Sequence, residues 1–256
     1  MTPGAAAVPP RLSVVVPAYR EAQRLPASLA RLPGALAAAG LPPLEILVVD
    51  DGSDDATAAV VDAAAARDPR IRRLSHRPNR GKGYAVRVGV LAARGDWVLV
   101  TDADLSTPPE EARALFRATR RGVAIAIGSR RVHGARIEVR QPLHREILGF
   151  GFAVLRRLLV LPTTRDTQCG FKLFRADVAR RLFAEAREDG WVYDVEILAL
   201  ARRHRLRVAE VPVRWADDPR SQVVVATAAP AMARGLFRLF LRRWARIPGG
   251  EPPPVS

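Results

Sequence analysis

Short apolar runs alternate with helical segments through the first half of this 256-residue chain. The apolar runs are residues 12–16, 44–49, 71–75, 97–101 and 123–128. Longer segments with helical character separate them, at 22–39, 56–67, 83–94 and 109–121. Strands that alternate with helices in this way pack as a mostly parallel sheet covered on both faces. The chain therefore predicts an α/β domain.

Polar side chains follow the ends of several of these predicted strands. They are Tyr19 and Glu21, Asp50 and Asp51, Asp102 and Asp104, and Ser129 and Arg130. The carboxyl ends of parallel strands meet at one edge of a sheet, and open α/β sheets bind their ligands there. We therefore expect one site along that edge.

Asp102 and Asp104 stand two positions apart after the apolar residues 98–100. On an extended segment, such residues point to the same side. A hard divalent cation is commonly held by one or two carboxylates together with substrate phosphates. The pair favours Mg²⁺ or Mn²⁺ and a nucleoside diphosphate, although a surface turn with two solvated acids would give the same pattern.

Two further segments are typical of nucleotide binding. Residues 79–83 read Asn-Arg-Gly-Lys-Gly ahead of a helix, and Lys82 is one of only two lysines. A helix N-terminus with a cation nearby favours a phosphate, although the spacing is not that of a Walker loop. Tyr19 offers a flat face for a base, and Glu21 offers acceptors for a base or ribose. Helix capping and dipole effects are the alternative explanation for these acids.

The charge balance favours polyanionic partners. The chain carries 41 basic and 26 acidic residues, for a net charge of +15. Such a charge suits nucleic acid, anionic lipid or phosphorylated substrates. A nucleic-acid-binding module is the alternative of another class, but the arginines are dispersed and no zinc, RRM or helix-turn-helix signature occurs. An inactive scaffold that binds nucleotide is a further alternative, against which the intact acid pair argues.

Cysteine content and hydropathy indicate the compartment. Cys169 is the only cysteine, which fits a reducing environment and a packing role. Residues 1–11 lack the apolar region of a signal peptide, and no run of 18 apolar residues predicts a membrane-spanning helix. We expect a cytoplasmic protein, peripheral on the inner face of the plasma membrane. The alanine- and arginine-rich composition is typical of GC-rich genomes, such as bacterial ones.

The motifs resemble those of a known family. VVVPAYRE, VVDDGSDDAT, NRGKGYA and TDADLS stand in the order found in family 2 inverting glycosyltransferases with a GT-A fold. DTQCGFKLF, WVYDVEIL, EVPVRW and the Gly-Ser-Arg at 128–130 are similar to dolichyl-phosphate glucosyltransferases and, more distantly, mannose synthases. The resemblance covers about residues 12–225. It implies a single Rossmann-like GT-A domain at 11–225. The Pro/Gly-rich ends, residues 1–10 and 248–256, are expected to be disordered.

The resemblance also implies roles for individual residues. Asp104, Asp102 and Ser106 would hold Mg²⁺ or Mn²⁺. The residues expected to bind the nucleotide sugar are Pro17, Tyr19, Glu21, Asp50, Asp51, Lys82 and Asp102. Those expected on the acceptor side are Arg130, Arg145, Gln168, Asp194, Arg220 and Ser221. Arg130 and Arg145, which would face the acceptor phosphate, complete the catalytic set with the two acids. In the family a lysine follows the last strand, and here Arg220 is the candidate to replace it.

The implied reaction moves a hexose, with inversion, from a nucleotide sugar to a polyprenyl or dolichyl phosphate. UDP-glucose is the expected donor, and a GDP-mannose-dependent mannosyltransferase is the alternative. A lipid phosphate is already ionised near neutral pH, so it needs cations that position it rather than a strong base. A hydroxyl acceptor would need a carboxylate base, for which Asp194 or Glu196 would be the candidate.

The segment 226–247 predicts a basic amphipathic helix. Its apolar side holds Met232, Leu236, Phe237, Phe240, Leu241 and Trp244, and its basic stripe holds Arg234, Arg238, Arg242 and Arg246. Such a helix can lie in a bilayer interface. It can equally pack on the domain with a solvated basic face. Residues 147–161 are a second candidate for an interfacial helix.

Overall fold

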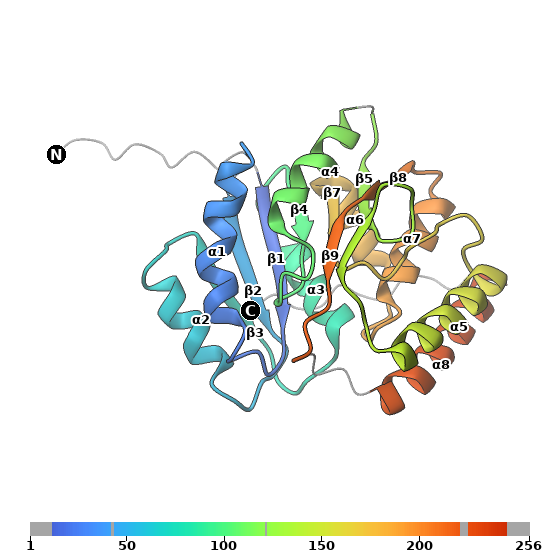
Figure 1. Ribbon diagram of the computed structural model, residues 1–256, viewed down its shortest axis with the longest axis horizontal. Coiled ribbons are helices and arrows are strands. Elements are labelled where there is room, and N and C mark those ends of the chain that lie inside the picture. The colour runs from blue at the N-terminus through green and yellow to red at the C-terminus, as the bar shows by residue number, and fades with distance from the viewer. Residues whose placement is uncertain (1–11, 42–43, 121, 221–224, 245–256) are drawn as a thin grey trace.

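A seven-stranded sheet forms the centre of the molecule (Figure 1). The computed structural model describes residues 12–41, 44–120, 122–220 and 225–244. The strands of this sheet, in spatial order, are β3 (Ile71–Ser75), β2 (Leu44–Asp50), β1 (Leu12–Ala18), β4 (Trp97–Val100), β7 (Lys172–Arg175), β5 (Ile125–Ser129) and β8 (Val208–Pro212). All neighbours pair in parallel except β7, which runs antiparallel to both β4 and β5. The predicted mostly parallel sheet is confirmed.

Helices cover both faces of the sheet because successive strand residues point to opposite sides. Val14 and Val16 pack with the helices of one face, whereas Val15 packs with those of the other. The first face is covered by α1 (Leu25–Ala38), α2 (Thr57–Ala65) and α4 (Ala112–Thr119), which follows the short helix η1 (Pro109–Glu111). The second is covered by α3 (Lys82–Ala92), α6 (Ala176–Glu185) and α7 (Tyr193–Arg203).

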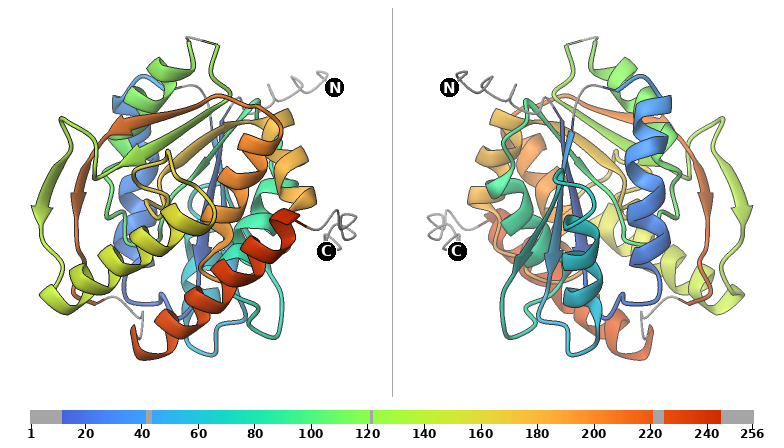
Figure 2. Two further views of the ribbon diagram at one scale, coloured as in Figure 1. Left: turned by 90° about the vertical axis from the view of Figure 1, so that its right-hand side faces the viewer. Right: turned by 90° about the vertical axis from the view of Figure 1, so that its left-hand side faces the viewer.

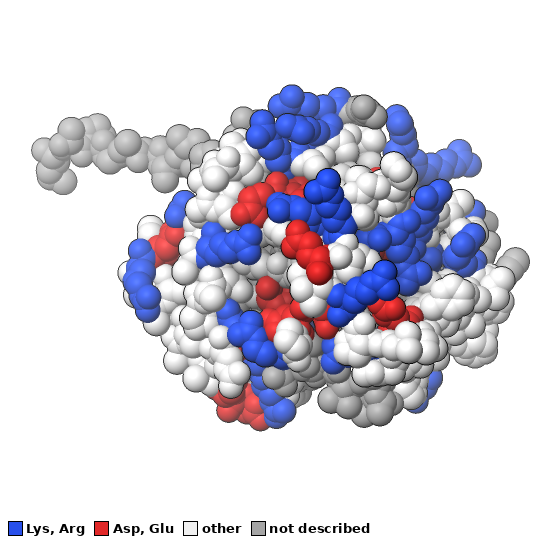
Figure 3. Space-filling model, viewed as in Figure 1, with Lys and Arg blue, Asp and Glu red and all other residues white. Residues whose placement is uncertain are grey.

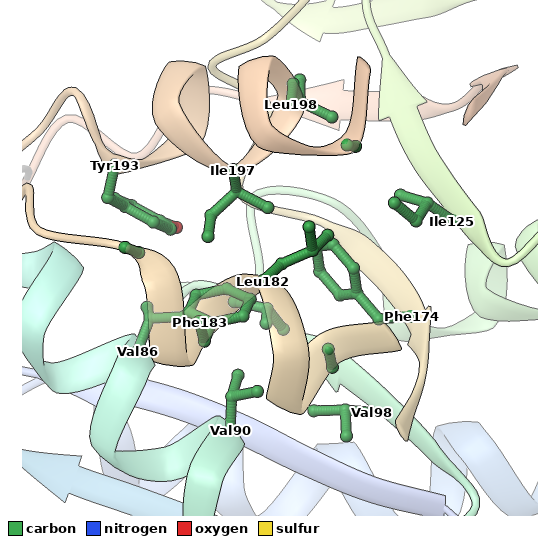
Figure 4. Packing of buried hydrophobic residues seen from close by; sticks show 14 of the residues in the cluster. Val86, Val90, Val98, Ile125, Phe174, Leu182, Phe183, Tyr193, Ile197 and Leu198 are labelled. Carbon is green, nitrogen blue, oxygen red and sulfur yellow. The ribbon is translucent and has the colours of Figure 1, made fainter. Parts of the chain in front are cut away.

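The core of the second face is built from side chains of distant segments. Phe174 of β7 and Phe183 of α6 meet edge to face, with ring centroids 5.7 Å apart. Val90 of α3 and Ile197 of α7 pack around the same cluster (Figure 4). This packing fixes the beginnings of α3 and α7 relative to the sheet, and both helices begin at the sheet's carboxyl edge.

Outside the sheet, the chain adds elements that sequence periodicity did not predict. Strand β6 (Arg136–Val139) pairs with β9 (Arg214–Ala216) in a small second sheet. Strand β6 is four residues long and exposed throughout, and β9 is three residues long, so neither contains an apolar run of the kind that predicts the main strands. The candidate helices at 147–161 and 226–247 correspond to α5 (Leu143–Leu159) and α8 (Val225–Trp244), which lie side by side (Figures 1 and 2).

The boundaries differ from expectation in detail. The helix predicted at 22–39 begins later, at Leu25, and Pro33 lies inside α1 without ending it. The termini 1–10 and 248–256, expected to be disordered, lie outside the described residues. Among the described residues, no helix combines the length and the apolar character needed to cross a membrane.

Candidate active site

The predicted acid pair lies directly beyond the carboxyl end of β4, with a cation beside each acid. Nζ of Lys82, at the start of α3, is 2.6 Å from Oδ1 of Asp102. Nη1 of Arg24 is 3.4 Å from Oδ2 of Asp104, and the backbone N–H of Ser106 donates to Oδ1 of Asp104 at 2.9 Å. The structure thus brings Lys82 and the acid pair together as the sequence predicts, and it adds Arg24.

The two acids differ in their protonation behaviour. Burial acts to raise the pKa of Asp102, but the Lys82 ammonium outweighs it and holds that pKa below its usual value. Burial and the neighbouring charge of Asp102 raise the pKa of Asp104. A divalent cation would offset the repulsion between the two carboxylates.

The donor set fits a metal that is completed by its substrate. Asp102 and Asp104 supply carboxylate oxygens, which Mg²⁺ and Mn²⁺ prefer. Among the described residues, no group of three or more histidines, cysteines or acids could hold a metal on its own. Two carboxylates with substrate phosphates as further ligands are the arrangement that the residues support.

The signature segment 166–174 reaches this centre because β7 is antiparallel. Lys172 is the register partner of Val100, so the residues before β7 lie at the end of β4. Gly170 lies against the acid pair so closely that a Cβ atom there would overlap Oδ2 of Asp102. A side chain at this position would therefore displace the carboxylate.

Two buried ion pairs hold the same segment. Asp166 accepts hydrogen bonds from Nε and Nη2 of Arg130 at 2.8 and 2.9 Å. Burial acts to raise the pKa of Asp166, but Arg130 outweighs it and holds that pKa far below its usual value. Lys172 is paired with Asp194, whose pKa is raised by burial. Arg130, expected to face an acceptor phosphate with its charge free, is instead bound to Asp166 in this structure.

A polar pocket of about 240 Å³ lies beside the acid pair, on the side of β1 and β2. Glu21 and Arg24 line it and form an ion pair with each other. Arg220 also lines the pocket, where it is paired with Asp218 at 2.8 Å. Red acidic groups near the centre of this face lie between blue basic groups (Figure 3). Glu21, predicted to bind the nucleotide sugar, therefore lies in the pocket together with Arg220, which is expected on the acceptor side. Ser221 lies outside the described residues.

The other residues expected at the nucleoside hold the loops around this pocket. Asp50 is buried and accepts a hydrogen bond from the backbone N–H of Ser53 at 3.0 Å. Each carboxylate oxygen of Asp51 accepts two hydrogen bonds from residues 76–81, so this acid fixes the glycine-rich loop. Pro17 is buried within β1, and Tyr19 is half-buried at its end. Their contacts with a nucleoside stay predictions.

The buried side-chain atoms without a hydrogen-bond partner include donors of two residues predicted on the acceptor side. Nε2 of Gln168 and Nε of Arg145 are buried atoms without a hydrogen-bond partner among the described residues. Gln168 belongs to the signature segment, and Arg145 lies in the first turn of α5. Gln141, just before α5, bonds Asp217 at 3.3 Å. Because buried donors are normally satisfied, both groups are candidates to bind a ligand.

Part of the predicted arginine stripe of α8 pairs with the domain, although Arg234 and Arg238 remain exposed. Arg238 and Arg242 bond Glu188, at 2.7 and 3.3 Å, which is a buried acid next to α7. Leu236 and Leu239 are buried on the domain. The helix therefore packs on the domain through part of its predicted apolar side and part of its basic stripe. Arg246 and the side chain of Trp244 lie outside the described residues.

The outer side of α5 and α8 forms an exposed apolar surface, which we call the α5–α8 face. Its members are Leu143, Ile147, Leu148, Phe150, Val154, Leu155, Leu158, Phe237 and Leu241. The most exposed are Leu158 at 75% and Leu143 at 71%. A contiguous surface of this kind marks an interaction site.

Sequence reasoning missed Arg24, Asp166 and Asp218, each of which carries a contact of the site. Arg24 stands three residues after Glu21 at a helix start, a spacing that favours an ion pair. Asp166 opens the signature segment. The contact between Arg24 and Asp218, at 4.0 Å, joins residues far apart in the chain and leaves no local signal.

The fold of the chain, a mostly parallel sheet covered by helices on both faces, is that of solved GT-A glycosyltransferases. The family described as Glycosyl transferase family 2 matches residues 13–183, and the chain belongs to that family. The fold and class predicted from the motifs are confirmed.

Two curated enzymes that share one name are similar to the chain over most of its length. The chain is 40% identical over 244 residues to dolichyl-phosphate beta-glucosyltransferase from Drosophila melanogaster, covering 90% of this chain and 74% of that protein. It is 34% identical over 245 residues to the Homo sapiens enzyme of the same name, covering 91% and 75%. These relatives are eukaryotic, so they give no support to the bacterial origin that composition indicated.

Solved structures share the fold at lower identity. Mannosyl-3-phosphoglycerate synthase from Rubrobacter xylanophilus superposes with a TM-score of 0.66 at 22% identity, covering 91% of this chain and 74% of that one. Glucosyl-3-phosphoglycerate synthase from Mycobacterium tuberculosis, solved with Mn²⁺ and UDP-glucose, gives 0.64 at 21% identity, covering 91% and 79%.

Proposed function

We propose that this glycosyltransferase moves glucose from UDP-glucose to the phosphate of a polyprenyl lipid such as dolichyl phosphate, with inversion at the anomeric carbon. The observation that carries the proposal is the pair Asp102 and Asp104 beside Lys82, held against the signature segment at Gly170. The named activity of the relatives supports the choice of glucose and dolichyl phosphate.

The donor would occupy the carboxyl edge of the sheet. Its nucleoside fits the pocket lined by Glu21, Arg24 and Arg220. Asp104 and Asp102 would hold a divalent cation, with Ser106 orienting Asp104. When bound, such a cation supplies positive charge to the departing diphosphate. Lys82, already beside Asp102, places a second positive charge at the same point.

The ion pairs of two buried acids favour an acceptor that is already ionised. Asp194 and Asp166 are both buried in ion pairs, with Lys172 and Arg130. An acid so engaged is poorly placed to take a proton from a hydroxyl acceptor. A lipid phosphate oxygen is already ionised and attacks the anomeric carbon without a base, opposite the leaving diphosphate. The chain's task on this side is to hold the phosphate.

The unpartnered donors support that task. Arg145 has a buried Nε without a partner in the described chain, and Gln168 has a free amide N–H. A phosphate oxygen would satisfy both groups. Arg145 therefore keeps its predicted role toward the acceptor phosphate. Arg130 would hold Asp166 in place. It would contact the acceptor phosphate only if that phosphate displaced Asp166.

The α5–α8 face supports a peripheral position at the cytosolic surface of a membrane. It begins at α5, whose first turn carries Arg145, so a lipid held there could keep its chain in the bilayer. Large apolar side chains buried in the acyl boundary stabilise binding, and surface-proximal arginines add about 1 kcal/mol each on anionic lipid.

The test is a donor panel. Purified protein is incubated with polyprenyl phosphate, Mg²⁺ or Mn²⁺ and labelled UDP-glucose, GDP-mannose or UDP-N-acetylglucosamine. The expected product is a lipid-extractable glucosyl phosphate with β configuration by NMR. EDTA and the Asp104→Asn variant should each abolish its formation. Glycolipid formed only from GDP-mannose would replace glucose by mannose, and no glycolipid from any donor would refute the proposal.

A further inference from the structure

A large aromatic side chain stands exposed beside the acid pair. Trp191 is 36% exposed, and its ring centroid lies 5.7 Å from Nζ of Lys82, the group that bonds Asp102. It belongs to residues 186–192, between α6 and α7, which we call the Trp191 loop. An indole at a polar site offers a flat apolar surface next to hydrogen-bonding groups.

The position of this ring separates it from the nucleoside pocket. Arg24 lines that pocket and lies beside Asp104. Lys82 lies beside Asp102 instead, and the ring of Trp191 lies beside Lys82. If the nucleoside fills the pocket on the Asp104 side, the opposite end of the donor, which is the hexose, lies toward Asp102 and Trp191.

The Trp191 loop is fixed on one side to the glycine-rich loop and α3. The backbone N–H of Tyr84 donates to the carbonyl of Asp189 at 3.0 Å. The carboxylate of Asp189 pairs with Arg80 at 3.0 Å and with Arg87. Nη1 of Arg87 also donates to the carbonyl of Ala186 at 2.8 Å. The loop and Lys82 are thus held as one unit.

On its other side the loop is tied to α8. Glu188, which is 3% exposed, accepts hydrogen bonds from Arg238 at 2.7 and 3.2 Å. Its backbone N–H donates to Glu196 at 2.7 Å. A Cβ atom at Gly235 of α8 would overlap the side chain of Val192, so helix and loop are in close contact. Separating a buried carboxylate from its ion-pair partner is strongly destabilising. Glu188 therefore holds its loop against Arg238 of α8.

We propose that Trp191 contacts the transferred hexose as an apolar wall of the donor site, and that Glu188 positions it by tying its loop to α8. The C–H face of a hexose packs on an indole, while Lys82 and Asp102 approach its polar groups. This inference rests on the proposed function, because it takes the donor to be a nucleotide hexose.

The first test distinguishes the loss of a contact with the hexose from a general loss of donor binding. Trp191→Ala is expected to raise KM for UDP-glucose about tenfold, the equivalent of about 1.4 kcal/mol of aromatic contact. The inhibition constant of UDP, which lacks the hexose, should stay within about twofold. Trp191→Phe should fall between wild type and Trp191→Ala in KM. Equal loss for UDP and UDP-glucose, or no change for either, would overturn the inference.

Fluorescence gives a second measurement. UDP-glucose should quench tryptophan emission of the wild-type protein more than UDP does, and Trp191→Phe should remove the difference. An equal response in both proteins contradicts the contact. A wild-type protein that transfers no sugar at all overturns the proposed function as well, whereas an active wild type with an unaffected Trp191→Ala variant overturns only this inference.

The positioning role has its own variants. Glu188→Gln and Arg238→Gln should each raise KM for UDP-glucose in the same direction as Trp191→Ala, with the UDP inhibition constant unchanged. Arg238 is half exposed, so its variant tests the link even where loss of the buried acid prevents folding. The matched control is Glu185→Gln. Glu185 lies on α6, and its carboxylate forms a hydrogen bond with Nε2 of His204 at 2.8 Å. An unchanged KM in the folded variants refutes the role of Glu188.

Discussion

Nη1 of Arg24 lies 3.4 Å from Oδ2 of Asp104, so the acid expected to bind the metal already has a cation beside it. The same guanidinium pairs with Glu21 and lies 4.0 Å from Asp218. Arg24 therefore lies within 4.0 Å of three acids at the edge of the pocket. A divalent cation that binds Asp104 must do so against this positive charge.

Removing that charge should tighten metal binding in the absence of donor. Arg24→Gln is expected to lower the dissociation constant for Mn²⁺ about fivefold, because a unit charge about 4 Å away in a water-like medium is worth about 1 kcal/mol. Electron paramagnetic resonance of free Mn²⁺ measures this directly. Arg31→Gln, which removes an α1 arginine paired with Glu110 at the surface, is the matched control. Weaker Mn²⁺ binding in Arg24→Gln would mean that Arg24 orders Asp104 rather than opposing the metal.

Gly170 gives a steric test of the acid pair. Gly170→Ala forces its Cβ into the carboxylate of Asp102, so Asp102 must move. Displacement of a catalytic group by about 1 Å costs on the order of a hundredfold in rate. We expect transfer to fall by at least that factor while the protein still folds, as judged by circular dichroism. In Gly34→Ala, within α1, the new Cβ meets nothing within 4 Å, and activity should be unchanged. Full activity in Gly170→Ala would show that Asp102 need not keep its place.

Sequence patterns predicted the parts of this molecule that are locally encoded. Apolar periodicity located β1 to β5 of the main sheet, whereas β7 and β8 overlap the DTQCGFKLF and EVPVRW motifs. The rule that ligands bind at the carboxyl ends of strands located Asp102 and Asp104. The resemblance of the signature segment to a family motif identified Gln168 as a site residue. The antiparallel direction of β7 explains why this segment lies beside the acid pair.

Contacts between distant residues could not be predicted in the same way. Arg24 and Asp104 stand 80 positions apart, and neither lies in a sequence pattern that identifies the other as its partner. The arginine stripe of α8 seemed suited to solvent or lipid because Glu188, 50 positions away from Arg238, is invisible to helical periodicity. Strand β6 is only four residues long and is exposed along its length, so it offers no buried apolar run that marks a strand.

The Asp166–Arg130 pair predicts a pH dependence of stability. The pKa of Asp166 is depressed in the folded state, so its contribution is fully present above the ordinary carboxyl pKa of about 3.9 and is lost as pH falls below it. We expect Asp166→Asn to lower the free energy of unfolding at pH 7 by on the order of 2–3 kcal/mol. Between about pH 4 and pH 2, that free energy should fall less steeply in the variant than in wild type.

Denaturant unfolding at a series of pH values provides the measurement. Asp177→Asn is the control, because Asp177 pairs with Arg175 at the exposed start of α6. It should change the stability at neutral pH little, since exposed pairs contribute about 0–1 kcal/mol. Parallel acid limbs in wild type and Asp166→Asn would argue that Asp166 is not ionised with the pKa that its ion pair implies.

The α5–α8 face predicts binding to lipid vesicles through its apolar side chains. Phe150 is 65% exposed and Leu158 is 75% exposed on α5. Burying a large apolar side chain is worth about 1.5–3 kcal/mol, so Phe150→Glu and Leu158→Glu should each weaken binding at least about tenfold. Cosedimentation with anionic vesicles measures the affinity. Ala59→Glu adds the same charge on α2, across the molecule, and should leave most of the binding intact (Figure 1). If all three variants bind alike, the arginine-rich surface rather than the α5–α8 face accounts for membrane binding.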